Sequence, residues 1–188
     1  MASTSSILPE DAVDTDRLFL IVVGASVEAE VWHRPLAYRL QELIDRWQEQ
    51  YCDVDIVDPL VITDAWYMAN SQLHRRPCVA IGPPNLNALT AYLSDKIPAV
   101  FGVEQRLVVQ ADPTFTHQHI CLWGSGAAAT AEALDAFADR YLEDLLKHIV
   151  AEEEEQSDAD SGDGDADSAH PDDEDTTTEP ESDSGEQN

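Results

Sequence analysis

The sequence is poor in basic residues, and lysine is the scarcest of them. Ten Lys and Arg residues stand against 38 Asp and Glu, which gives a net charge of −28. Only Lys96 and Lys147 are lysines. Such a charge repels phosphate backbones and anionic headgroups, so we expect neither duplex nucleic acid nor a membrane as a partner. The same composition fits either a halophilic protein adapted to high salt or an ordinary acidic protein.

Long apolar runs and paired cysteines are also missing. No apolar stretch approaches the ~18 residues that a membrane-spanning helix needs. The first 16 residues lack the basic and apolar segments of a secretory signal. The three cysteines, Cys52, Cys78 and Cys121, are widely spaced and odd in number. This pattern indicates reduced thiols, and we therefore expect a cytoplasmic location.

Several catalytic and nucleotide-binding motifs are absent. No G-x-G-x-x-G follows the first apolar run, and no P-loop pattern occurs, so dinucleotide and P-loop nucleotide binding are unsupported. A full G-x-S-x-G nucleophile elbow is missing as well, although Ser125 lies between two glycines. The sequence identifies neither a cofactor nor a catalytic residue.

The residues that are present predict an α/β domain. Short apolar runs alternate with amphipathic segments, which is typical of βαβ units and a mainly parallel sheet. We therefore predict a compact three-layer Rossmann-like or flavodoxin-like domain over residues 17–150, after a flexible lead-in, 1–16. Residues 151–188 hold seventeen acids, no Lys or Arg, and no apolar side chain larger than Ala or Pro. We predict that this acidic tail is disordered.

The expected elements follow the apolar pattern. Helices are predicted over 35–50, 86–96 and 127–150, with an ambiguous segment at 65–75. The predicted strands are 18–23, 78–81, 100–103, 107–110 and 119–123. Of two further strand-like pieces, 54–57 and 60–63, we expect one to be a strand and the other its extension or a loop.

Four of these strands end in loops that could form one ligand site. In parallel sheets, ligands bind at the carboxyl ends of the strands. We expect a shared cleft there for a nucleoside-, sugar- or phosphate-type ligand. Aromatic, hydroxyl, carboxylate, amide and guanidinium groups would bind its ring, hydroxyls and anionic group. The candidate residues are Ser26, Glu28, Trp32, Arg34, Asp64, Trp66, Tyr67, Asn85 and Asn87.

The same residues also have a purely structural interpretation. Small residues after a strand make tight turns, and Asp64 is a favoured helix cap whatever the function. Arg34 lies among many carboxylates and could form ion pairs within the fold. Both interpretations remain open at this point.

A possible metal site lies near the last predicted strand. His117, His119 and Cys121 are spaced by two, which places all three on one face of an extended strand. Imidazole and thiolate are ligands of zinc and copper. Zinc motifs usually draw ligands from two places in the chain, and no second pair is evident, so a metal site is not favoured.

Residues 79–89 are similar to a strand–turn–helix segment known from other proteins. The sequence Val-Ala-Ile-Gly-Pro-Pro-Asn-Leu-Asn-Ala-Leu resembles the Gly-Gly-Pro-x-x-Asn turns of Rossmann-like units in cell-wall-binding and S-layer proteins. Pro83 replaces the second Gly of those turns. The last strand and helix, 119–138, fit the same plan, and the resemblance implies a Rossmann-like fold, not a function.

Three functions follow as hypotheses. The first is a Rossmann-like module that self-associates or binds a partner, with a homodimer expected because four tryptophans are many for one small domain. The second is a small-molecule enzyme or binding protein that uses the strand-end cleft. The third is a metal-binding protein.

Overall fold

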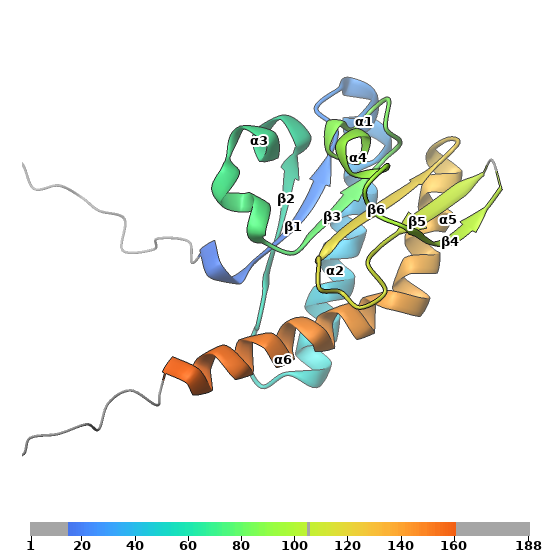
Figure 1. Ribbon diagram of the computed structural model, residues 1–188. Helices are drawn as coiled ribbons and strands as arrows, with labels where there is room; N and C mark the ends of the chain where they lie inside the picture. The colour runs from blue at the N-terminus through green and yellow to red at the C-terminus, as the bar shows by residue number, and fades with distance from the viewer. Residues whose placement is uncertain (1–14, 105, 161–188) are drawn as a thin grey trace, which may run out of the picture.

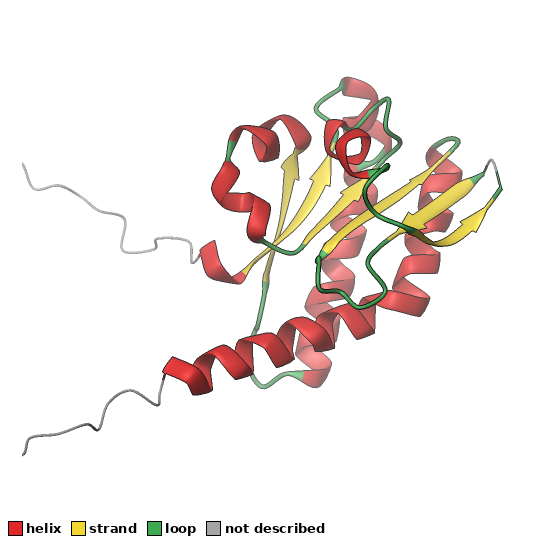
Figure 2. Cartoon of the chain, in the orientation of Figure 1, coloured by secondary structure: helices red, strands yellow, loops and turns green. Residues whose placement is uncertain are grey.

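The computed structural model describes residues 15–104 and 106–160 of the chain. It is an α/β fold built on one six-stranded sheet (Figures 1 and 2). The strands are β1 (Leu18–Val23), β2 (Asp58–Thr63), β3 (Cys78–Ile81), β4 (Ala99–Val103), β5 (Leu107–Gln110) and β6 (His119–Gly124). The helical segments are η1 (Thr15–Arg17), α1 (Val27–Trp32), α2 (Arg34–Tyr51), α3 (Asp64–Ala69), η2 (Ser71–Arg75), α4 (Ala88–Leu93), α5 (Ala127–Phe137), η3 (Ala138–Leu142) and α6 (Glu143–Asp160).

The sheet is mixed, which corrects the prediction of a mainly parallel sheet. Its order is β2-β1-β3-β6-β5-β4. The first four strands pair in parallel, whereas β5 is antiparallel to both β6 and β4. A reversal at β5 follows from its short connections, because a parallel crossover needs a dozen or more residues.

The central strands are buried on both faces. In β1, alternate side chains enter two different apolar clusters, Phe19 and Ile21 in one and Leu20 and Val22 in the other. The first cluster continues into α2, α5 and α6, and the second continues into α3 and α4. A strand that packs on both faces has a continuous apolar sequence, which is why this run predicted β1 correctly.

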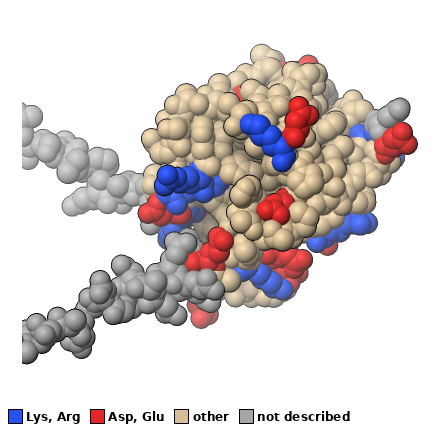
Figure 3. Space-filling model, viewed as in Figure 1, with Lys and Arg blue, Asp and Glu red and all other residues tan. Residues whose placement is uncertain are grey.

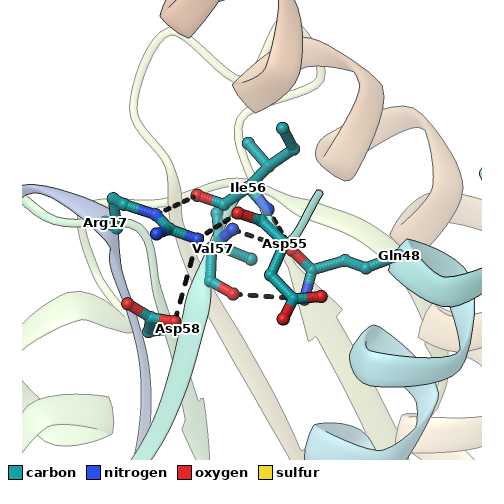
Figure 4. Close-up of polar contacts among 6 residues, drawn as sticks. All are labelled: Arg17, Gln48, Asp55, Ile56, Val57 and Asp58. Carbon is teal, nitrogen blue, oxygen red and sulfur yellow. Dashed lines mark hydrogen bonds and ion pairs between the residues drawn. The ribbon is translucent and has the colours of Figure 1, made fainter. Parts of the chain in front are cut away.

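The segment between α2 and β2 is a loop that contains residues 54–57, so the strand of the two candidate pieces is the one over 60–63. Its backbone bonds side chains instead of a neighbouring strand (Figure 4). Gln48 Oε1 accepts the N–H groups of Ile56 and Val57, both at 2.8 Å, and its Nε2 donates to the Val57 carbonyl. Arg17 donates to the Ile56 carbonyl from the other side. The spacing of apolar residues alone does not show which backbone groups will hydrogen-bond to side chains.

The helical run predicted over 127–150 is longer and less regular than expected. It extends from α5 to the end of α6 at Asp160 through the π-helical segment η3. Figure 1 shows the axis turning at this segment, so that α6 crosses near the beginnings of the central strands. Residues 151–160 of the predicted acidic tail are therefore helical, and its remainder, 161–188, lies outside the described residues, as do residues 1–14 of the lead-in.

No helix among residues 15–104 and 106–160 is long and apolar enough to cross a membrane.

Candidate functional site

The carboxyl ends of β1, β3 and β6 surround a hollow of about 500 Å³. We call it the strand-end hollow. Its walls come from α1, the turn after β3 and the turn after β6. The residues that define it are Glu28, Trp32, His33, Asn85, Trp123 and Ser125. Three of these, Glu28, Trp32 and Asn85, are among the residues predicted from the sequence.

The turn between β3 and α4 approaches the end of β1 very closely. Gly24 allows this, because a Cβ at that position would lie 1.7 Å from the carbonyl oxygen of Leu86. Gly82 has a φ of 114°, which side-chain-bearing residues rarely adopt, and the ring of His33 lies against it. The two glycines therefore set the position of the turn that forms one wall of the hollow.

Asp64 lies at this edge of the sheet but does not line the hollow. Its Oδ1 accepts the N–H groups of Ala25 and Ala65 at 2.9 and 2.7 Å, and its Oδ2 accepts that of Ala88 at 2.7 Å. The buried carboxylate thus joins the loop after β1, the start of α3 and the start of α4. Thr63, not Asp64, provides the N-cap of α3.

The side-chain amide of Asn87 is also hydrogen-bonded to backbone groups. It is buried, its Oδ1 accepts the N–H groups of Leu89 and Thr90, and its Nδ2 donates to the carbonyls of Val22 and Ile81. It therefore caps α4 and ties that helix to the ends of two strands.

The remaining predicted residues are dispersed. Ser26 caps α1 by accepting the N–H of Ala29, and Arg34 pairs with Glu30 on the next turn. Trp66 is exposed on α3 and does not line the hollow. The loop predicted to contain Ser26 and Glu28 is in fact the start of helix α1.

His33 lines the hollow although it was not in the predicted set of site residues. Its side chain is only 2% exposed, and Nδ1 has no hydrogen-bond partner among the described residues. Burial lowers the pKa of His33, although the charge of Glu28 opposes this shift. Nδ1 lies against Gly82 and has almost no exposed surface, so the imidazole packs as part of the wall of the hollow.

The beginning of α5 forms the floor opposite α1. Gly126 is its N-cap and offers no capping side chain, and the first turn has no acidic residue. The free N–H groups of a helix N-terminus attract anions. A planar ring could lie against Trp32 and Trp123, and an anionic group on that ring could bind at the N-terminus of α5.

Tyr67 belongs to a second hollow, of about 450 Å³, between α3, α4 and the start of β6. We call it the Tyr67–His119 hollow. Its defining residues are Tyr67, Met68, His74, Tyr92, Lys96 and His119.

The weak candidates for metal ligands lie in different surroundings. His117 and His119 line the Tyr67–His119 hollow, and the Nε2 of His119 lies 3.2 Å from the hydroxyl of Tyr67. Cys121 is fully buried, and burial raises the pKa of its thiol to about 12. Within the described ranges, no three His, Cys, Asp or Glu side chains are placed to hold a metal ion.

The two buried histidines predict a dependence of stability on pH. Burial lowers the pKa of both His33 and His119 from the ordinary value of 6.5. For His119, contact with the His74 backbone opposes the shift, whereas the charges of His117 and His74 add to it. The unfolded chain therefore binds protons more readily, so stability is complete above about pH 6.5 and decreases below it.

We expect the melting temperature to fall between pH 7.5 and 5.5, a window above the main titration of carboxylates. His33→Gln and His119→Gln should each reduce this dependence when measured at constant KCl. An unchanged slope in both variants would contradict the assignment.

No protein-family model matches this chain, and no curated protein is similar to it in sequence.

Proposed function

We propose that the chain is a Rossmann-like, flavodoxin-like domain in three layers that binds a small ligand in the strand-end hollow. The order β2-β1-β3-β6 of its parallel strands supports this proposal, since flavodoxin-like sheets bind ligands where the strand order reverses. In this chain the reversal falls between β1 and β3. The segments that follow these two strands, α1 and the turn before α4, line the hollow.

The proposed ligand has a planar ring, a hydroxyl-bearing part and an anionic group. Trp32 and Trp123 would contact the ring, and Glu28 would accept hydroxyl hydrogen bonds. The N-terminus of α5, which lines the same hollow, would hold the anionic group. The joint placement of Trp32, Trp123 and Glu28 around one hollow, beside an α5 N-terminus that has no capping side chain, carries the proposal.

Binding can be tested with adenosine, AMP and ribose 5-phosphate on the full chain. We expect AMP to raise the melting temperature, since a ligand stabilises the state to which it binds. Trp32→Ala should weaken AMP binding about tenfold, because stacking of a base on an aromatic side chain is worth about 1–3 kcal/mol.

Trp66→Ala is the matched control. Both tryptophans are about half exposed, but only Trp32 lines the hollow. The proposal fails if none of the three compounds binds at millimolar concentration, or if the two variants weaken AMP binding equally.

A second candidate function is self-association. Large apolar side chains remain exposed on α1 and α3, namely Val27, Val31, Trp66 and Met68. Exposed patches of this kind mark interaction sites. We expect light scattering to give twice the chain mass of 20.7 kDa, and Val31→Glu to reduce it to that of a monomer. A monomeric mass for the unaltered chain at tens of micromolar would remove this candidate.

A further inference from the structure

The Tyr67–His119 hollow lies apart from the strand-end hollow, and the two share no lining residue. It opens beside α3 and α4, on the face of the sheet opposite α2 and α5. Its volume of about 450 Å³ is in the range of small-molecule sites, and most of its lining area is apolar.

Aromatic groups dominate one side of this hollow. Tyr67 is buried, and its ring stacks on that of His74 with 4.8 Å between centroids. Its hydroxyl is held 3.2 Å from His119 Nε2, and His74 Nε2 lies 3.1 Å from the Tyr67 carbonyl. These contacts fix the rings in place, so the apolar wall is already formed before any ligand enters.

The charge of the hollow is unlike that of the rest of the protein. Although the chain has 38 acidic residues, none of the residues that line this hollow is Asp or Glu. Figure 3 shows an uncharged surface over α3 on this face, while one basic and one acidic group lie side by side over α4. Asp95 is exposed next to Lys96 in the sequence but does not line the hollow.

Lys96 is the cation of this site. Its Nζ lies 3.1 Å from the centroid of the Tyr92 ring, and it has no salt bridge to any described carboxylate. The other lysine, Lys147, pairs with Glu143 at 2.6 Å. Burial lowers the pKa of His119, so its imidazole is neutral near pH 7 and Lys96 supplies the positive charge.

We propose that the Tyr67–His119 hollow is a second ligand site, which binds a small aromatic carboxylate. The ligand ring would lie against Tyr92, Met68 and the apolar wall, and its carboxylate would bind Lys96. A single cation beside an acid-free, aromatic-lined hollow matches a molecule with one negative charge on an apolar ring. Larger polyanions do not match, because only one lysine faces the hollow.

Met68 provides a direct probe of occupancy. The chain has two methionines, and Met68 lines the hollow. With ¹³C-methyl methionine in the full chain, phenylacetate should shift the Met68 signal progressively and saturate in the millimolar range or below. Phenylacetamide has the same shape without the charge, and it should bind about tenfold more weakly because hydrogen bonds to charged groups are stronger.

Lys96→Gln should weaken phenylacetate about tenfold and leave phenylacetamide unchanged. Because Lys96 is exposed, the variant should fold normally, and its unligated spectrum will show whether it does. Lys147→Gln removes the other lysine and should leave both affinities unchanged. The proposal is overturned if phenylacetate leaves the Met68 signal unmoved, if Lys96→Gln does not discriminate between the two compounds, or if Lys147→Gln has the same effect.

Discussion

Asp64→Asn should destabilise the protein by about 3–5 kcal/mol, one of the largest effects we expect from any polar substitution. The carboxylate of Asp64 accepts three backbone N–H groups, from Ala25, Ala65 and Ala88. An amide has one oxygen and one NH₂ group, so either orientation would place a donor against at least one of these N–H groups. The substitution therefore removes a charge-assisted bond and leaves a buried donor without a partner.

Urea denaturation at constant KCl measures this loss without changing the ionic strength. Asp95→Asn is the matched control, because Asp95 is exposed, and its free energy of unfolding should change by less than about 0.5 kcal/mol. A loss under about 1 kcal/mol for Asp64→Asn would show that the three bonds are not formed in solution.

Gly24→Ala should cost about 3 kcal/mol or more, which corresponds to a fall of roughly 10 °C in melting temperature. The added Cβ would lie 1.7 Å from the Leu86 carbonyl oxygen and 3.1 Å from the Ala29 Cβ. A backbone oxygen cannot rotate away, so the whole turn before α4 would have to move. Since this turn forms a wall of the strand-end hollow, AMP binding should weaken as well.

Gly126→Ala distinguishes crowding from a general effect of replacing glycine. Its φ of −179° is extended backbone, and a Cβ there would meet no atom within 4 Å. Because Gly126 is the N-cap of α5 and Ala is a poorer cap than Gly, we expect a loss below about 1 kcal/mol. Equal losses in the two variants would refute the close approach at Gly24.

The parts of the fold that the sequence predicted are those in which burial determines the residue type. Strands β1, β3 and β6 are apolar runs that pack on both faces, and each was predicted within a residue or two. The direction of β5 was not predicted, because an apolar run carries no information on strand polarity. The signal that could have revealed it is connection length, since only residues 104–106 separate β4 from β5.

The candidate site was predicted less well, for a different reason. Asp64 and Asn87 follow strand ends, as ligand-binding residues do, but their side chains bond the backbone. A sequence shows the residue type at a strand end and not which backbone groups lie nearby. His33 was left out of the predicted set because a histidine beside an arginine, among many carboxylates, is expected to form ion pairs, and the sequence does not show that it is buried.

The turn at η3 has an electrostatic consequence. It directs α6 along the side of the sheet where the central strands begin, so the described chain ends at Asp160 away from the carboxyl ends that border the strand-end hollow (Figure 1). Every charged residue beyond Asp160 is acidic apart from any titrating histidine. A six-residue strand is roughly 20 Å long, whereas the Debye length at physiological ionic strength is about 8 Å. The carboxylate of Glu152, which lies beside Leu18 at the beginning of β1, is therefore screened from a ligand in the strand-end hollow.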